Sequence, residues 1–180
     1  MNSEIKITES DAQISIAVAV VIERTETPQS KWGYPVWKVF AVIAGEHIEQ
    51  YDQSMVIHDE GKSTRFYWGG LSLNLYKDGS EGYWYNLLSD VPYLFVVCDG
   101  EEGAHEIEPS FVTANQDEAN ASMESDDMVL SIPMPIDIRE LVERYVISHY
   151  SPEQKKKRKR KEWIEESQYA KRQAKNFSNE

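Results

Sequence analysis

Bulky apolar side chains alternate with small or polar ones in the N-terminal part of the chain. In "ISIAVAVVI" (14–22), isoleucine or valine occupies every even position, whereas serine and alanine hold most of the odd positions. Successive side chains of a β-strand point to opposite faces, so this alternation predicts a strand with one face toward a core. Runs rich in apolar residues predict further strands at 36–43 and 53–59. Two prolines and a glycine predict a loop at 26–35.

The middle of the chain alternates β-rich runs with turn residues. The runs are "RFYWGGLSLNLY" (65–76), "YWYNLL" (83–88) and "YLFVVC" (93–98), separated by "KDGSEG" (77–82) and "SDVP" (89–92). The pair Asp78-Gly79 supplies the turn chemistry of a hairpin, so we expect these runs to form an antiparallel meander. The pair Gly69-Gly70 within the first run predicts a bulge, at which the strand bends.

The C-terminal part combines short strands with helices. After an acidic loop at 99–108, strands are predicted at 109–114 and 127–132 and a short helix at 113–122. Thr113 and Gln116 have the spacing of a capping box, which is the basis for the short helix. Apolar residues then recur at i, i+3 and i+4 over 135–150. This spacing predicts an amphipathic helix that closes one face or end of the sheet.

These elements predict an α+β fold. We expect a curled, mainly antiparallel sheet of about six to eight strands, with closure into a barrel left open, and a C-terminal amphipathic helix. Residues 1–150 are predicted to form a single acidic domain, and residues 151–180 a basic, helical tail that projects from it. The domain holds 9 Lys and Arg against 26 Asp and Glu, whereas the tail holds 10 against 5.

The charge and the cysteine count limit the class of protein. A body with a net charge of −17 repels phosphate backbones at long range, which disfavours general nucleic-acid binding, whereas a tail of +5 attracts an acidic surface. Cys98 is the sole cysteine, which excludes an internal disulfide and fits a reducing cytoplasm. The apolar stretch 14–22 is too short to span a bilayer, so we expect a cytoplasmic protein without a membrane span.

Seven consecutive basic residues begin the tail. Ser151-Pro152-Glu153-Gln154 has the composition of a helix start, so the basic run is expected on a polar helix. The residues assigned to partner binding are Lys155, Lys156, Lys157, Arg158, Lys159, Arg160, Lys161, Trp163 and Ile164. Three interpretations remain open: a solvated helix that can fold back on the acidic body, a docking element for an acidic protein partner, and contact with nucleic acid or a membrane surface.

Aromatic residues are the second candidate for a binding face. We predict that 65–76 and 83–88 pair as a hairpin, each carrying three consecutive aromatic residues. Neighbouring side chains of a strand alternate between faces, so part of this aromatic set must lie away from the core, against the C-terminal helix or a partner. The possible aromatic face consists of Trp32, Trp37, Trp68 and Trp84.

Catalytic and metal-binding signatures are absent from the sequence. The histidines His47, His58, His105 and His149 lie in four separate segments without metal-ligand spacing, and His149 falls on the apolar side of the predicted C-terminal helix. Cys98 ends an apolar strand, where a buried inert thiol is expected. Glycine-rich phosphate loops and the G-x-S-x-G nucleophile motif are missing. We therefore predict no catalytic residue, no metal and no cofactor.

An ordered set of segments carries a family resemblance. They are "VAVVIER" (18–24), "VWKVFAV" (36–42), "LSLNLY" (71–76), "YNLLSDVPYLFVV" (85–97), "FVTAN" (111–115), "IPMP" (132–135) and "KKRKRK" (156–161). In this order they resemble the bacterial family called domain of unknown function 3305. The resemblance implies a gene located among those for molybdenum-dependent formate dehydrogenase and its accessory factors. It supplies no catalytic or binding residue.

The sequence and the resemblance lead to two functional hypotheses and a weaker third. The first is a non-catalytic accessory factor that binds an acidic protein partner, such as a formate dehydrogenase subunit or maturation factor. The second is a binding protein or enzyme for a molybdopterin species, because some family members are labelled as molybdopterin guanine-dinucleotide biosynthesis proteins. This chain lacks the glycine-rich loop that such a nucleotidyltransferase needs. The third hypothesis is a regulator that acts through nucleic acid.

Overall fold

The structure is a computed structural model that describes residues 7–10, 13–26, 33–45, 48, 54–101 and 103–151. Eight strands and three helices lie in these ranges. The strands are β1 (Ile7–Ser10), β2 (Gln13–Thr25), β3 (Val36–Ala44), β4 (Met55–Asp59), β5 (Ser63–Tyr76), β6 (Tyr93–Asp99), β7 (Glu108–Thr113) and β8 (Met128–Pro133). The helices are α1 (Ser80–Leu87), α2 (Gln116–Glu124) and α3 (Ile136–His149).

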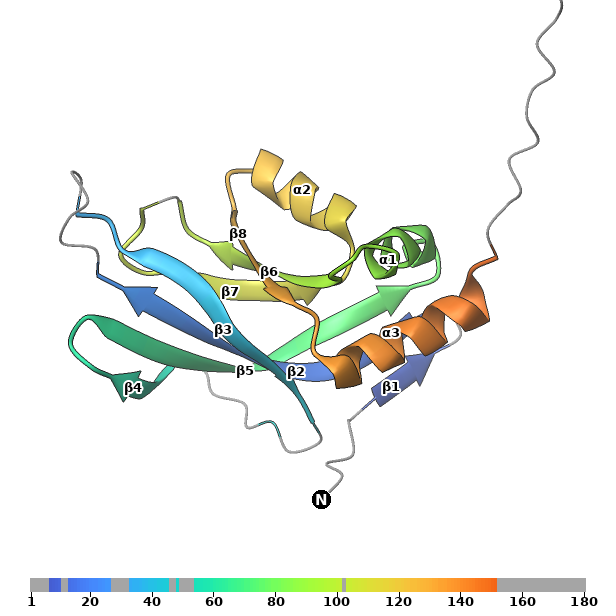
Figure 1. Ribbon diagram of the computed structural model, residues 1–180, viewed down its shortest axis with the longest axis horizontal. Coiled ribbons are helices and arrows are strands. Elements are labelled where there is room, and N and C mark those ends of the chain that lie inside the picture. Colours follow the sequence, from blue (N-terminus) through green and yellow to red (C-terminus); the bar gives the residue numbers. More distant parts are fainter. Residues whose placement is uncertain are drawn as a thin grey trace, which may run out of the picture.

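The strands form one curled sheet in the order β1-β2-β5-β7-β6-β8. β3 pairs with β2 on the same edge as β1, but farther along the strand, at residues 18–25. In the same way, β4 pairs with residues 64–67 of β5, on the edge where β5 meets β7 at Leu73. β3 and β8 then approach each other, so the sheet comes close to closing into a barrel (Figure 1). The α+β class and the curled, mainly antiparallel sheet predicted from the sequence are confirmed. The exception is a parallel contact between β5 and β7, at Leu73 and Val112.

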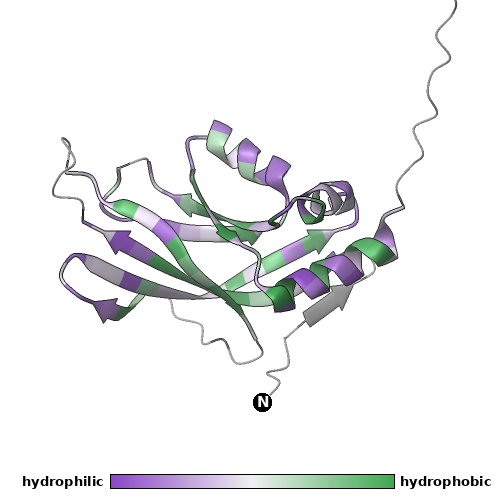
Figure 2. Ribbon diagram, viewed as in Figure 1, coloured by the Kyte–Doolittle hydropathy of each residue, from purple (hydrophilic) through white to green (hydrophobic). Residues whose placement is uncertain are grey.

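The core lies inside this curled sheet. The inward face predicted for β2 is confirmed, because Ile16, Val18, Val20 and Ile22 are all fully buried. They face apolar residues of β5, β6 and β7 in one cluster. Ala19 and Val21 on the opposite face are buried too, so the middle of β2 is covered on both sides. Figure 2 shows hydrophobic residues concentrated where β2, β3 and β5 cross. Burying this apolar surface is the main force that curls the sheet.

Two helices close one end of the barrel. The predicted amphipathic helix is confirmed as α3, which buries Ile138, Val142, Tyr145 and Val146 and contacts α1. Figure 1 places α1 and α3 at one end of the sheet, while the β4–β5 turn and the β6–β7 loop lie at the other. The two ends therefore differ, since one is filled by helices and the other is open.

The predicted bulge at Gly69-Gly70 is confirmed. Val18 pairs with Leu71 and Val20 with Trp68, so two glycines of β5 stand opposite Ala19 alone. Gly70 has a φ of 78°, a conformation that residues with a side chain rarely adopt. The extra residue bends β5 and keeps both halves of the strand facing the same core.

Residues 83–88 form the main part of a helix, so the predicted strand and aromatic hairpin were wrong. Ser80, Tyr83 and Asn86 are buried at the i, i+3, i+6 spacing of a helix face. A Cβ at Gly82 would lie 2.5 Å from the Asn115 side-chain oxygen, so glycine is required for α1 to approach the start of α2. These tertiary contacts outweigh the β-propensity of the Tyr-Trp-Tyr sequence.

Buried polar groups join α1 to the sheet. The Asn86 side-chain amide donates to the backbone oxygens of Tyr93 and Ala114, both at 2.7 Å, and its oxygen accepts from the Tyr93 N–H at 3.0 Å.

The short helix predicted after β7 is confirmed as α2, but the Thr113–Gln116 capping box was wrong. Asn115 caps α2 by accepting from the Asp117 N–H at 3.0 Å.

Replacing Asn86 with alanine tests this junction. The change removes three hydrogen bonds and leaves the buried oxygen of Ala114 and the partly buried backbone groups of Tyr93 without these partners, so we expect a loss of about 2–4 kcal/mol in the free energy of unfolding. Urea denaturation measures this loss. The matched control is Leu88→Ala next to the same helix, because Leu88 is exposed. Equal losses in the two variants would contradict the role of Asn86.

Candidate functional site

The open end of the barrel contains a split in the sheet. On one edge of β5, residues 64–67 pair with β4, and Leu73 meets β7. Between them, residues 68–72 have no strand partner on this edge among the described residues. β5 and β7 meet near the helical end and diverge toward the open end (Figure 1).

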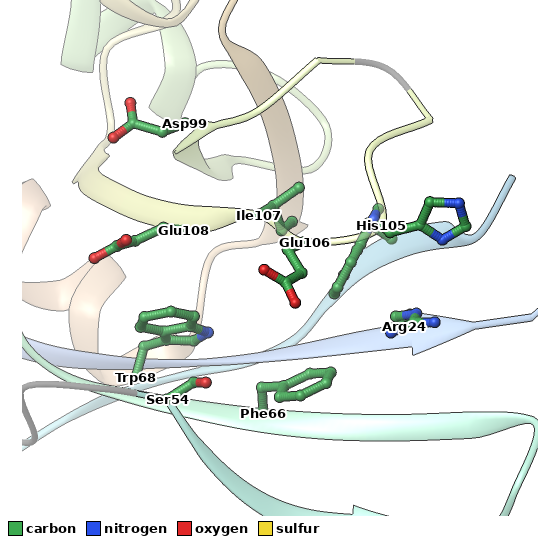
Figure 3. Close-up of a pocket in the computed structure, with 10 residues that line it drawn as sticks. Arg24, Ser54, Phe66, Trp68, Asp99, His105, Glu106, Ile107 and Glu108 are labelled. Carbon is green, nitrogen blue, oxygen red and sulfur yellow. The ribbon is translucent and has the colours of Figure 1, made fainter.

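A cavity of about 490 Å³ lies at this split. Its lining residues are Arg24, Trp37, Ser54, Phe66, Trp68, Asp99, His105, Glu106, Ile107 and Glu108 (Figure 3). The aromatic residues come from β3 and β5, whereas the carboxylates come from the end of β6, the β6–β7 loop and the start of β7. The volume is within the usual range of about 300–1,000 Å³ for ligand pockets.

Strand register explains why the aromatic side chains gather on one wall. Arg24 pairs with Trp37, and the neighbouring β2 positions Ile22 and Val20 pair with Phe66 and Trp68. Cross-strand partners point to the same face of a sheet. The even-numbered residues of β2 point into the barrel, so their partners on β3 and β5 do so too.

Trp37 connects the aromatic wall to the opposite loop. Its indole N–H donates to the backbone oxygen of Ala104 at 2.8 Å, and its ring lies 6.0 Å from that of Phe66. The loop holds Gly103 with a φ of 86°, where a Cβ would lie 2.9 Å from the Tyr34 ring. The loop that carries the carboxylates is therefore positioned against β3.

Arg24 occupies one end of the aromatic wall. Its guanidinium carbon lies 5.9 Å from the centre of the Trp37 ring, within the range of a cation–π contact. Glu26 forms an ion pair with the same guanidinium. The buried Nε of Arg24 has no hydrogen-bond partner within the described part of the chain.

Three charged residues hold the strands together behind this wall. Glu23 is 4% exposed, and its carboxylate lies 2.5 Å from Lys38 Nζ and 2.8 Å from Arg65 Nε. The hydrogen bond from Lys38, followed by that from Arg65, lowers the pKa of Glu23 to about 2. Arg65 also lies over the Phe40 ring at 3.7 Å. The cluster joins β2, β3 and β5 at the positions next to the lining residues.

Carboxylates form the other side of the cavity. Asp99, Glu106 and Glu108 are all exposed. Figure 3 shows the Glu106 carboxylate pointing into the space between the loop and the side chains of Phe66 and Trp68. His105 points away from that space. An aromatic wall facing carboxylates is suited to hold a positively charged group.

Several other chemistries find no support in the described residues. They contain no group of three or more His, Cys, Asp or Glu side chains that could hold a metal ion. Burial raises the pKa of the Cys98 thiol to about 12, so it stays protonated and unreactive, as its position predicted. Among the described helices, none combines the length and the hydropathy needed to cross a bilayer.

The structure brings together part of the predicted aromatic face. Trp37 and Trp68 line the same cavity. Trp84 is elsewhere, with its ring 6.1 Å from that of Tyr150, which connects α1 to the end of α3. Trp32 and the basic run with Trp163 and Ile164 lie outside the described residues.

Sequence reasoning missed Arg24 and the carboxylates. The segment 99–108 was interpreted as an acidic loop, and nothing in its local sequence indicated that it would face aromatic residues from two distant strands.

His149 is partly buried, and its ring stacks on that of Tyr145 at a centroid distance of 4.3 Å. This agrees with its predicted place on the apolar side of the C-terminal helix.

Replacing Glu23 with glutamine tests the ion cluster. Because folding lowers the Glu23 pKa, this carboxylate stabilises the fold above its ordinary pKa of 4.5, and the contribution is lost as the pH falls toward about 2. We expect Glu23→Gln to lower the free energy of unfolding by about 1–2 kcal/mol at neutral pH, because Lys38 and Arg65 lose their charged partner but remain partly exposed to water.

The gap between the wild type and Glu23→Gln should shrink steadily as the pH falls from 4.5 to 2. Urea denaturation at several pH values measures it. Glu124→Gln, at an exposed helical position, is the control and should change stability by less than about 0.5 kcal/mol. A gap that stays constant over this pH range would contradict the assignment.

Comparisons with known proteins identify the family. A family model described as "Protein of unknown function (DUF3305)" matches residues 17–159, which is most of the chain and includes all the residues that line the cavity. No curated protein and no solved structure matches the chain. The chain therefore belongs to the DUF3305 family, as the ordered sequence segments indicated.

Proposed function

We propose that this chain is a non-catalytic accessory protein that binds a partner protein through the open end of its barrel. The observation that carries the proposal is the cavity at the split between β5 and β7, where Trp37, Phe66 and Trp68 face a loop rather than the closed core. Tryptophan side chains in a partly open pocket are typical anchors for protein partners.

The strand edges beside the cavity favour an extended segment of the partner. In the part of the chain that the structure describes, residues 68–72 of β5 have no strand partner on one edge, and β4 lies next to them. Met55, Val56 and Ile57 of β4 are exposed, which is unusual for three consecutive large apolar residues. An added strand would pair with backbone groups and place alternate side chains in the cavity.

The basic run 155–161 supplies a second contact in this proposal. Its charge is opposite to that of an acidic partner surface, and it lies beyond α3 in the chain. Such a run increases the rate of encounter with an acidic partner and makes binding sensitive to salt. The sequence resemblance supplies the cellular context, in which the partner is a subunit or maturation factor of a molybdenum-dependent formate dehydrogenase.

The charge of the cavity favours a protein partner over a molybdopterin species. A phosphate group would meet Asp99, Glu106 and Glu108, while Arg24, the one Lys or Arg among the described lining residues, is already paired with Glu26. Carboxylates that line the same cavity as a phosphate group repel it. A molybdopterin ligand would have to use other residues than those of the cavity.

Affinity purification of the full-length chain from its native host tests this function. Four forms are compared: wild type, Glu106→Lys with Glu108→Lys, residues 155–161 all replaced by glutamine, and the control Glu124→Lys with Glu140→Lys. Both control positions are exposed and carry the same change in charge as the cavity variant. The lysate is treated with nuclease, and folding of each variant is checked by thermal unfolding.

We expect formate dehydrogenase subunits or maturation factors to copurify with the wild type and the control, and to be reduced several-fold with the cavity variant. The glutamine variant should also recover less partner at low salt, and its recovery should depend less on salt, because it lacks the cations whose attraction to an acidic surface is screened over about 8–10 Å. Equal recovery with all four forms would overturn the proposed surface. Recovery of no such partner would overturn the proposed context.

A further inference from the structure

We infer that the cavity is a receptor for one cationic side chain, an arginine or a lysine, carried by the extended partner segment. This inference rests on the proposed function and adds the chemistry of the residue that is recognised. It depends on the charge of the rim, on the aromatic wall and on the β5 edge at residues 68–72, which has no strand partner among the described residues.

The charge of the cavity is negative on balance. The lining holds three carboxylates, those of Asp99, Glu106 and Glu108, while Arg24 is matched by Glu26. Of the three, Glu106 points toward the aromatic wall, and Asp99 and Glu108 lie at the rim. A cation that enters replaces the water around these carboxylates with a favourable interaction, whereas an anion meets repulsion. A neutral apolar side chain would contact the aromatic rings but leave the carboxylates without a partner.

The aromatic wall provides the second element of recognition. Trp68 and Phe66 lie across from Glu106, so a group placed between them would contact a ring face and a carboxylate at once (Figure 3). The same fold already holds two guanidinium groups over aromatic rings, Arg24 over Trp37 and Arg65 over Phe40. Tryptophan is the strongest of the aromatic side chains in such contacts.

The edge of β5 that faces β7 provides the route of entry. Gly69-Gly70 lies within residues 68–72, which pair with β2 on one edge and have no partner on the other within the described ranges, and Gly70 is exposed. Without side chains, these two residues leave room for an approaching backbone. A strand added here lies next to Trp68, so one of its inward side chains reaches the cavity.

The experiment uses the full-length protein and two peptides of the same length. The probe is acetyl-Thr-Val-Arg-Val-Thr-amide, and its control carries citrulline, which keeps the shape of arginine without the charge. Indole N–H signals in two-dimensional NMR report the binding site, since Trp37 and Trp68 line the cavity and Trp84 does not. The signals are assigned with single Trp→Phe variants.

We expect the arginine peptide to shift the Trp68 and Trp37 signals in a saturable way and to leave Trp84 unchanged. The citrulline peptide should bind about tenfold more weakly, because it lacks the charge that both walls recognise. Glu106→Gln with Glu108→Gln should weaken the arginine peptide by a similar factor. Glu124→Gln with Glu140→Gln, the control of equal charge at exposed positions, should leave its affinity unchanged within about twofold.

Three results would overturn the inference. They are equal affinity for both peptides, equal weakening by the cavity variant and its control, or shifts that do not include Trp68. If one of these results occurs while partner capture still depends on Glu106 and Glu108, the proposed function stands, and the inference that the cavity recognises a cationic side chain is overturned.

The basic run of the chain itself is the competing occupant. If its lysines and arginines filled the cavity, replacing residues 155–161 with glutamine would tighten arginine-peptide binding several-fold, and the inference that a partner residue fills the cavity would be overturned. An unchanged affinity in that variant supports the partner residue.

Discussion

The ion pairs of Glu23 with Lys38 and Arg65 determine the geometry of the open end. A buried carboxylate is costly without partners, so β2, β3 and β5 are held in the register that supplies both cations. A slip of one residue would break the cluster and would also turn the inward side chains to the outer face. The charged cluster on the outside thus fixes the aromatic wall on the inside.

The two ends of the barrel use the sheet differently. At one end, α3 fills the interior with apolar side chains, and α1 is tied to the sheet through Asn86. At the other end, β5 and β7 diverge from their parallel contact at Leu73 and Val112. The cavity lies at the split between them.

Local patterns in the sequence predicted much of the sheet but not the site. Alternation identified β2, and Gly69-Gly70 identified the bulge, because both signals depend on neighbouring residues. The segment 83–88 was misread because its aromatic residues favour strands, while the contacts that hold it as a helix include Ala114 and Asn115, which are distant in the sequence. Trp37 and Trp68 were identified as part of an aromatic face from the local sequence. Their proximity to the 99–108 loop was not predicted, because it depends on contacts between residues that are distant in the sequence.

The central claim is that the open end of the barrel contacts a partner, and site-specific photocrosslinking in the native host tests it most directly. A benzoylphenylalanine in place of Ser54, which lines the cavity, should form an adduct with a partner protein near an arginine or lysine of that partner. The same group in place of the exposed Glu124 should not form this adduct. Identical adducts from both positions, or none from Ser54, would contradict the account.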